Sequence, residues 1–432
     1  MTSNKNGIIA PKKAGKVGTK PEAIGEKWPT RKNDERVKKK YSRFLYLCAA
    51  MLDRIILLPY YLTLKLRHFC YDHGIRKVKT CEIPTICVGN ITAGGTGKTP
   101  HTEMILRTLL KSDDWAYEDI AVLSRGHRRS TRGFQIVKRE GSVKEYGDEP
   151  LQIKKKFPGV TVAVDRHRVK GCDILCHPEK LKTEKRARGC ADAEIAPADL
   201  IVLDDAFQYR SLRAYLNIIL VDYNRPVHKD HLLPFGRLRD LPERLSEADF
   251  IIVSKCPAYM EDVQKVQWAQ AFGLMDYDPQ TCKGTDKNGK EKILLFTTIW
   301  YSSLKPVFDE ADPRYAYSQK LILFSGIAKD TPLRMYLSDE HKIVRRFRFE
   351  DHHKYTKADI RKIMRAVKEH PTAVVATTEK DCQRILDLKD IPDDLRVRMF
   401  QVPIEVGFLS EHEKALFENA LLGALRAFHS DY

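Results

Sequence analysis

The segment from Gly89 to Pro100 contains the residues with the clearest chemistry, a run of glycines followed by Lys98 and Thr99. Glycine lets backbone N–H groups turn inward around phosphate oxygens, and a following helix N-terminus adds partial positive charge. We expect the Lys98 ammonium to reach the terminal phosphates of a nucleotide and the Thr99 hydroxyl to ligate Mg²⁺. The residues expected to bind the nucleotide are Thr92, Ala93, Gly94, Gly95, Thr96, Gly97, Lys98 and Thr99.

The sequence on both sides of this loop is what a phosphate-binding loop requires. Residues 84–88 form a short apolar run with β-branched side chains, which predicts a strand, and residues 102–110 have helical spacing. The loop departs from the strict G-x-x-x-x-G-K-[ST] pattern because Thr92 occupies the first glycine position, so we interpret it as a variant with a GGxGKT core. A chance glycine-rich turn is the alternative, and the flanking strand and helix disfavour it.

An acidic motif follows later in the chain. Residues 199–203 predict a buried strand that ends in Asp204 and Asp205. In P-loop folds such a carboxylate holds Mg²⁺, and a simple strand-end turn is the alternative. The sequence leaves open which of the two carboxylates would touch the ion.

Short apolar runs alternate with helical stretches through most of the chain, and this alternation predicts an α/β fold with a mainly parallel sheet. The further runs are 120–123, 218–221, 250–253, 321–324 and 373–376. Functional residues are expected at the carboxyl ends of such strands. Residues 276–292 are rich in Asp, Lys, Gly and Thr, which favours a loop.

The 432 residues carry a formal net charge of +17, which indicates an anionic partner. Residues 1–40 contain part of this charge and are expected to form a disordered basic tail. No basic patch interleaved with aromatic residues occurs on a recognisable module, so nucleic acid is not an expected partner. Ten cysteines without a CxxC pair favour reduced thiols in a cytosolic compartment.

Residues 41–75 differ from this tail because two apolar runs, 44–52 and 55–64, flank Asp53-Arg54. Charge at the centre disfavours a helix that spans a membrane. A helix that lies in the membrane interface fits better, since aromatic and basic residues accompany the apolar ones. A buried helical hairpin kinked at Pro59 is the alternative.

Seven motifs, taken together and in order, resemble those of the tetraacyldisaccharide 4′-kinase family of lipid A biosynthesis. They are Val88–Pro100, Leu123–Gly126, Gly147–Pro150, Asp204–Gln208, Leu232–Arg239, Asp351–His353 and Thr377–Asp381. The chain departs from the family pattern at Ala206, where glycine is usual, and at His127–Arg129. These departures affect local backbone and remove no charged catalytic group.

The resemblance implies a fold and a reaction. The fold would be two α/β/α domains of the P-loop NTPase type, with an N-terminal helix at the membrane interface. The reaction would be phosphoryl transfer from ATP to the 4′-hydroxyl of an acylated glucosamine disaccharide 1-phosphate. Asp148 would be the catalytic carboxylate that takes the hydroxyl proton, paired with His352, while Lys98 acts on the phosphates. The residues alone would instead make Asp148 a helix-cap acid before Pro150 and His352 a polar loop residue.

The resemblance also implies further site residues. Glu149 and Gln208 match family positions near the metal, and they join Thr99, Asp204 and Asp205 as expected Mg²⁺-site residues. The side chains of Arg237 and Arg239 suit substrate phosphate oxygens, because an arginine fork matches them, and a solvated basic loop is an equally good interpretation.

The expected division of the chain is a tail (1–40), a membrane-associated helical segment (41–75), a P-loop kinase domain (76–290), a linker (291–320) and a smaller C-terminal α/β domain (321–432). The resemblance implies a peripheral or monotopic position at the cytoplasmic face of the bacterial inner membrane, with the lipid surface as a partner. A P-loop GTPase or metallochaperone-type ATPase is the alternative function. It predicts a guanine-specificity motif or paired metal-binding Cys/His residues. Ser254-Lys255-Cys256 resembles a guanine-specificity motif only weakly.

Overall fold

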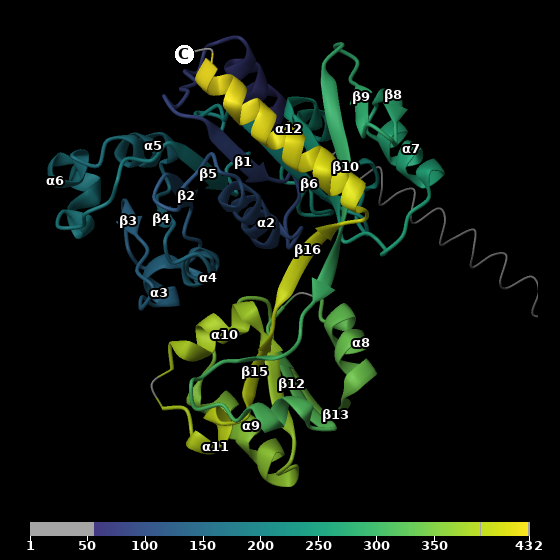
Figure 1. Cartoon of the computed structure of the whole chain (residues 1–432). Helices are drawn as coiled ribbons and strands as arrows, with labels where there is room; N and C mark the ends of the chain where they lie inside the picture. The colour runs from purple at the N-terminus through teal and green to yellow at the C-terminus, as the bar shows by residue number, and fades with distance from the viewer. Residues whose placement is uncertain (1–55, 328, 389, 431–432) are drawn as a thin grey trace, which may run out of the picture. The chain divides into compact units, whose positions relative to one another are not determined.

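A computed structural model describes residues 56–327, 329–388 and 390–430. Residues from Leu57 onward form one compact unit that contains two sheets (Figure 1). The predicted tail, 1–40, and the first part of the predicted membrane segment lie outside the described residues. The rest of that segment is helical over residues 56–72.

The larger sheet has eleven strands among the described residues, and its central strands are parallel. Their order is β4 (Thr161–Val164), β2 (Ile120–Ser124), β5 (Leu200–Asp204), β1 (Thr85–Gly89), β6 (Leu216–Asp222), β7 (Phe250–Ser254) and β10 (Glu291–Tyr301). Antiparallel strands pair outside this parallel set, and they are β3 (Gln135–Ile136), β8 (Met275–Asp278), β9 (Lys283–Thr285) and β16 (Ile404–Phe408). The predicted α/β fold with a mainly parallel sheet is confirmed.

Both faces of this sheet are covered by helices, as a parallel sheet requires. Alternate residues of β5 show this, since Ile201 and Leu203 belong to one hydrophobic cluster and Leu200 and Val202 to another. The first cluster includes residues of helix 56–72, α5 (Arg168–Cys176) and α7 (Asp262–Ala271). The second includes residues of α2 (Lys98–Lys111), α4 (Asp148–Lys156) and α12 (Glu411–Ser430).

The smaller sheet forms a second α/β/α unit. Its order is β11 (Lys305–Pro306), β15 (Met399–Val402), β14 (Val374–Thr378), β12 (Lys320–Ser325) and β13 (Lys342–Arg348), with only β11 antiparallel to its neighbour. One face packs against α8 (Thr331–Glu340), and the other against α9 (Lys357–Glu369), α10 (Glu379–Leu386) and α11 (Asp393–Arg396). Helix α9 begins at a capping box of Thr356 and Asp359, because each side chain accepts a backbone N–H of the other.

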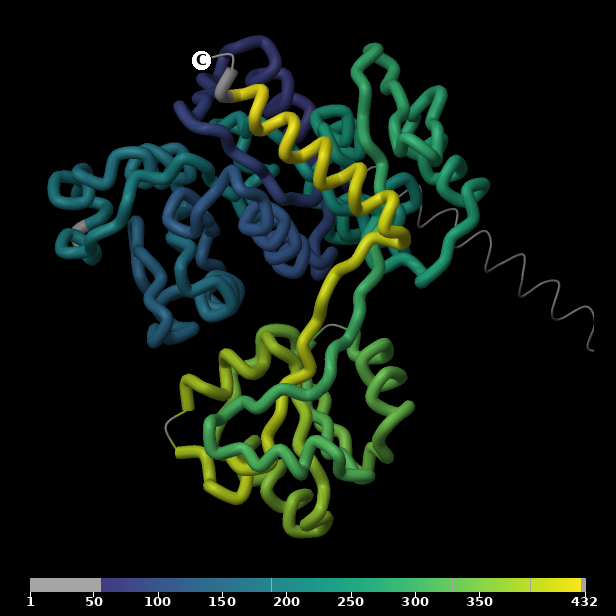
Figure 2. The backbone as a smooth tube through the Cα atoms, in the orientation of Figure 1, coloured from purple at the N-terminus to yellow at the C-terminus, as the bar shows by residue number. Residues whose placement is uncertain are grey.

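Strands β10 and β16 belong to the larger sheet and extend from it toward the smaller one (Figure 2). Residues 293–296 of β10 pair with β7 of the larger sheet, and residues 297–301 pair with β16. After β16 the chain returns to the larger sheet, where α12 buries Phe417, Leu421 and Leu425. The structure thus differs from the expected division into a linker, 291–320, and one domain, 321–432.

The predicted loop over residues 276–292 is wrong in part, since β8 and β9 form there and pair antiparallel beside β10, while residues 279–282 and 286–290 lie outside the strands. Their polar residues carry no strand pattern, and backbone pairing with an existing strand explains them. The remaining short elements are α3 (Val143–Tyr146), α6 (Lys180–Thr183) and the 3₁₀ helices Lys185–Cys190, Val227–Lys229, Pro242–Glu247 and Pro313–Tyr317. None of the described helices has the length and apolar composition needed to cross a bilayer.

Candidate active site

The predicted phosphate-binding loop connects β1 to α2 at the carboxyl edge of the larger sheet. Gly94 (φ 112°) and Gly97 (φ 89°) adopt positive φ values that glycine tolerates best. Helix α2 begins at Lys98, and its first turn has neither a capping side chain nor an acidic residue. Its first N–H groups are therefore available to a phosphate.

The buried side chain of Asn90 forms hydrogen bonds with residues of this loop and with Arg239. Its amide nitrogen donates to Thr96 Oγ1 over 2.8 Å, while its Oδ1 accepts from Arg239 Nη2 at 2.6 Å and from Lys98 Nζ at 3.5 Å. Lys98 Nζ also lies 3.6 Å from Asp205 Oδ1. The lysine predicted to act on phosphate thus lies between the loop and the acidic end of β5.

The segment Leu232–Arg239 lies alongside the phosphate-binding loop. The Ala93 N–H donates to the Arg237 carbonyl at 2.6 Å, and the Arg239 N–H donates to the Ile91 carbonyl at 2.8 Å. The Arg239 guanidinium turns into the site, where Nη2 also donates to Asp205 Oδ1 at 3.2 Å. The Arg237 side chain is exposed, and a Cβ on Gly94 would come within 2.9 Å of its Nη1. Both predicted arginines therefore lie at the loop.

Asp204 and Asp205 end β5 in opposite electrostatic environments. Burial, with repulsion from Glu149 and Asp205, raises the pKa of Asp204 to about 7. Burial also disfavours the charged form of Asp205, but the charges of Lys98 and Arg239 outweigh it and lower the pKa of Asp205. Asp204 Oδ2 accepts from Ser124 Oγ at 3.2 Å, whereas the buried Oδ1 has no hydrogen-bond partner in the described structure. Such an oxygen is suited to a cation.

The other predicted metal-site residues differ in how well they fit. Thr99 is buried in the first turn of α2, and Glu149 lies near enough to influence the pKa of Asp204. Gln208 is not joined to the acidic pair by any described contact. Its carbonyl oxygen accepts from Arg67 at 2.8 Å, and its Nε2 is buried without a hydrogen bond.

Asp148 and His352 meet although they are 204 residues apart in the chain. Asp148 is the first residue of α4, and His352 lies in the loop after β13. His352 Nδ1 lies 3.1 Å from Asp148 Oδ2, and Arg384 Nη2 lies 2.5 Å from the same oxygen. Burial would raise the pKa of Asp148, but the His352 hydrogen bond and the charges of Lys380 and Arg384 outweigh it and lower that pKa. Asp148 is therefore ionised at neutral pH.

Sequence reasoning missed three basic residues of this site. Lys255 Nζ donates to Asp222 Oδ2 at 2.6 Å and to the Gly95 carbonyl, while Arg168 Nη2 donates to the carbonyls of Asp204 and Asp205 at 3.3 and 3.4 Å. Lys255 directly follows β7, so its place at the carboxyl edge of the sheet could have revealed it. Arg168 and Arg384 lie in helices, and their local sequence does not mark them.

The family model described as Tetraacyldisaccharide-1-P 4'-kinase (LpxK) matches residues 49–425, most of the chain. The chain belongs to this family. The match spans the phosphate-binding loop, the acidic end of β5 and the Asp148–His352 pair, so all three lie within the part that the tetraacyldisaccharide 4′-kinases share.

Individual members of the family agree with this assignment. The tetraacyldisaccharide 4'-kinase from Phocaeicola vulgatus is 35% identical to the chain, and the match covers 82% of this chain and 89% of that protein. The tetraacyldisaccharide 4'-kinase from Parabacteroides distasonis is 36% identical, and the match covers 83% of this chain and 90% of that protein. A crystal structure of LpxK from Aquifex aeolicus in complex with ATP matches with a TM-score of 0.58 and 24% identity, over 84% of this chain and 98% of that one. This likeness shows that the fold is shared.

Proposed function

We propose that the chain transfers the γ-phosphoryl group of ATP to the 4′-hydroxyl of tetraacyldisaccharide 1-phosphate, which gives lipid IVA in lipid A biosynthesis. The observation that carries this proposal is made of two contacts in a tetraacyldisaccharide 4′-kinase: Lys98 beside Asp205 at the acidic end of β5, and Asp148 beside His352. Glu149, which follows Asp148, lies near enough to influence the pKa of Asp204 and so links the two. The ATP complex of the Aquifex aeolicus protein supports ATP as the donor.

Asp148 is proposed to accept the proton of the attacking hydroxyl. An alcohol must lose its proton during attack, and an ionised carboxylate within hydrogen-bond reach can take it. His352 would orient this carboxylate through the 3.1 Å contact of its Nδ1. The lowered pKa makes Asp148 a weak base, but the loose transition state of phosphoryl transfer depends more on position and charge than on early proton removal.

The phosphate end of the site is proposed to combine Lys98, the loop N–H groups and Mg²⁺. Thr99, Asp204, Asp205 and Glu149 would hold the ion, which supplies positive charge to the phosphate oxygens when bound. Gln208 belongs to this set only through its position three residues after Asp205. Arg237 and Arg239 are proposed to clamp phosphate groups, with Arg237 on the exposed side of the loop.

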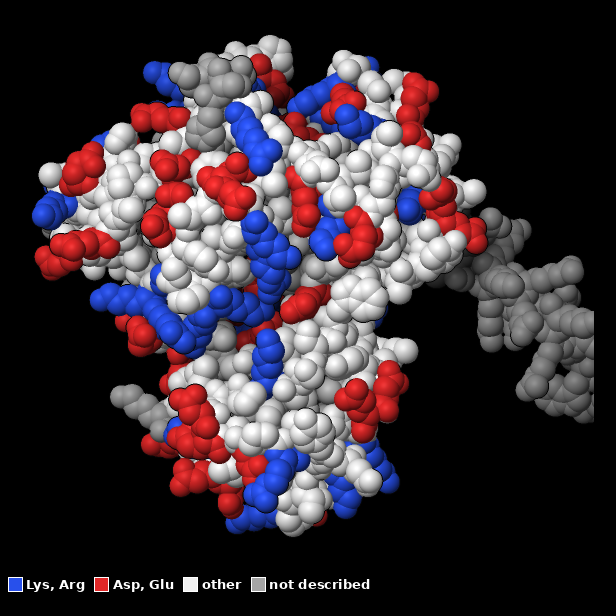
Figure 3. Space-filling model, in the orientation of Figure 1, with Lys and Arg blue, Asp and Glu red and all other residues white. Residues whose placement is uncertain are grey.

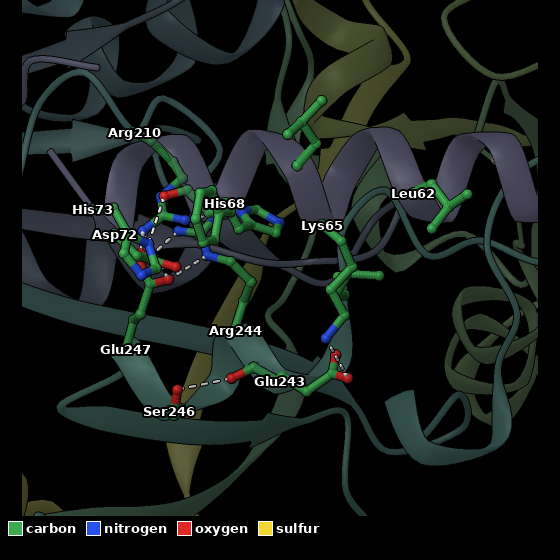
Figure 4. Close-up of a pocket in the computed structure, with 13 residues that line it drawn as sticks. Leu62, Lys65, His68, Asp72, His73, Arg210, Glu243, Arg244, Ser246 and Glu247 are labelled. Atoms are coloured by element: carbon green, nitrogen blue, oxygen red, sulfur yellow. Dashed lines mark hydrogen bonds and ion pairs between the residues drawn. The ribbon is translucent and has the colours of Figure 1, made fainter. Parts of the chain in front are cut away.

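A lipid surface is the second proposed partner. Helix 56–72 buries Leu57 and Leu64 in the core, whereas Leu62, Leu66 and Phe69 are 54%, 63% and 50% exposed. These three residues line a pocket of about 680 Å³ (Figure 4). An apolar face of this kind beside basic side chains is typical of a helix that lies in a membrane interface. Figure 3 shows a separate feature, a band of Lys and Arg side chains near the level where the larger-sheet and smaller-sheet parts meet. We propose peripheral contact with the cytoplasmic face of the inner membrane.

Thin-layer chromatography tests the proposed reaction and its residues. Purified protein is incubated with radiolabelled ATP, Mg²⁺ and tetraacyldisaccharide 1-phosphate. We expect Lys98→Ala and Asp148→Ala each to lower product formation by at least about 100-fold, because each removes charge placed for the transition state. The control Lys182→Ala changes an exposed lysine of α6 and should retain full activity. No labelled lipid from the unmodified protein would refute the function, and full activity of Asp148→Ala would refute that residue's role.

A further inference from the structure

Helix α10 is joined by ion pairs to α4, the helix that begins with Asp148. Three pairs make this contact: Lys156 Nζ with Glu379 Oε1 at 2.7 Å, Lys380 Nζ with Glu149 Oε1 at 2.9 Å, and Arg384 Nη2 with Asp148 Oδ2 at 2.5 Å. Helix α10 contributes Ile385 to the hydrophobic core of the smaller sheet, whereas α4 contributes Leu151 and Ile153 to a core of the larger sheet. The proposed catalytic carboxylate is therefore held by charge from the other sheet's helix.

Arg384 is itself fixed in one orientation. Its side chain is 6% exposed, and its Nη1 donates to Asp381 Oδ1 at 2.8 Å. Asp381 Oδ2 in turn accepts from the Gly326 N–H at 2.8 Å and from Thr378 Oγ1 at 2.7 Å. A guanidinium is planar and always charged. Because Asp381 holds Nη1 of Arg384, Nη2 of the same rigid group is held at a fixed position beside Asp148.

The two carboxylate oxygens of Asp148 have different hydrogen-bond partners. Oδ2 receives both Arg384 Nη2 and His352 Nδ1, while Oδ1 accepts the Glu149 backbone N–H at 3.2 Å. His352 Nδ1 also lies 3.1 Å from Arg384 Nη2, but a ring nitrogen that donates to Asp148 cannot accept from arginine. Beside an ionised Asp148 the donor tautomer is favoured, so both groups donate to Oδ2. Oδ1 then keeps a lone pair for a substrate hydroxyl.

We propose that Arg384 is a positioning residue of the phosphoryl transfer, which fixes the Asp148 carboxylate so that Oδ1 faces the attacking 4′-hydroxyl. This inference rests on the proposed role of Asp148. It gives the Thr377–Asp381 motif a physical role: Thr378 caps α10, Glu379 and Lys380 bind α4, and Asp381 braces Arg384. No covalent step involves Arg384.

Steady-state kinetics separates positioning from a general loss of structure. Arg384→Ala should lower kcat by about 100-fold, the scale of a misplaced reacting group, and leave the KM for ATP unchanged. Arg384→Lys keeps the charge but loses the fork, so it should recover part of that kcat. The control Arg396→Ala removes an arginine of α11 that pairs with Glu310 at 2.6 Å, and it should behave like the unmodified protein.

A double-mutant cycle tests whether Arg384 acts through Asp148. We expect Arg384→Ala to lower kcat in the unmodified background and to have no further effect on the residual activity of Asp148→Ala. An equal fold loss in both backgrounds would overturn the inference, as would an Arg384→Ala variant of unmodified kcat beside an impaired Asp148→Ala. Full activity of Asp148→Ala would instead refute the proposed role of Asp148. If Arg384→Ala does not fold, Arg384→Gln takes its place in the cycle with the same expected outcomes.

Discussion

Asp204 and Asp205 are neighbours in sequence, yet their surroundings give them different properties. Asp205 is stabilised as an anion by Lys98 and Arg239, while Asp204 is buried with an unpartnered Oδ1 and a raised pKa. A bound cation would offset both the burial and the repulsion from Glu149 and Asp205 that raise the pKa of Asp204. This difference makes Asp204 the more direct candidate for Mg²⁺, a choice that the sequence left open.

Removing the groups around Asp204 should change the Mg²⁺ requirement of the kinase. Ser124→Ala deletes the hydroxyl that donates to Asp204 Oδ2, and it should raise the Mg²⁺ concentration for half-maximal activity by about 10-fold or more. Asp204→Asn should raise it further. The control Ser246→Ala removes the hydroxyl of a half-buried residue, which donates to the Glu243 carbonyl at 2.8 Å. A Mg²⁺ titration of initial rates measures the effect, and unchanged half-saturation in both variants would contradict this role of Asp204.

Single residues also show the limit of sequence reasoning. Lys98 and Thr99 could be predicted because loop, strand and helix are contiguous, so local sequence contains the whole signal. Asp148 and His352 could be paired only through the family resemblance, since 204 residues separate them. Arg384 was missed because its role depends on contacts between helices from two different sheets.

At the scale of elements, apolar β-branched runs predicted the central strands, because both faces of those strands are buried. Strands β8 and β9 were missed because their residues are polar and their formation depends on the edge of β10. The expected C-terminal domain, 321–432, includes the residues of α12, although Phe417 lies 5.6 Å from Phe250 of β7, measured between ring centroids. An apolar helical face does not reveal which sheet it covers.

The packing of α12 on the larger sheet can be measured by truncating one core residue. Leu421 is fully buried, so Leu421→Ala should lower the free energy of unfolding by about 2–5 kcal/mol. The control Asn419→Ala changes an exposed position of the same helix and should be close to neutral. Urea denaturation measures both variants. An Leu421→Ala protein as stable as the control would contradict the packing of α12 against this core.

At the scale of the whole molecule, the described unit presents an apolar helix face beside a nucleotide site. Tyr60 Oη donates to the Arg239 carbonyl at 3.1 Å, and Arg67 donates to the Gln208 carbonyl at 2.8 Å. Helix 56–72 is thus bonded directly to two segments that carry predicted site residues. This arrangement would place an acylated substrate, held by its chains in a lipid surface, close to the phosphate-binding loop.

Polar substitutions on the outer face of this helix should weaken membrane contact without unfolding the protein. The triple variant Leu62→Ser, Leu66→Ser, Phe69→Ser should bind less to vesicles that contain anionic lipid, because it removes exposed apolar area. A matched triple variant at exposed positions of α9, Arg361→Ser, Lys362→Ser, Lys368→Ser, should keep more of the binding. Vesicle co-sedimentation compares them. If the Leu62→Ser, Leu66→Ser, Phe69→Ser variant binds vesicles as well as the unmodified protein does, this face is excluded as the contact.

The chemical position of the transferred phosphate tests the central claim most directly. Mass spectrometry of the lipid product should show one added phosphate when ATP, Mg²⁺ and tetraacyldisaccharide 1-phosphate are supplied, and fragmentation should place it at the 4′-position. A 4′-deoxy acceptor should give no phosphorylated product, because the proposed nucleophile is absent. Phosphorylation of the 4′-deoxy acceptor, or hydrolysis of ATP with no phosphorylated lipid from the natural acceptor, would contradict the account.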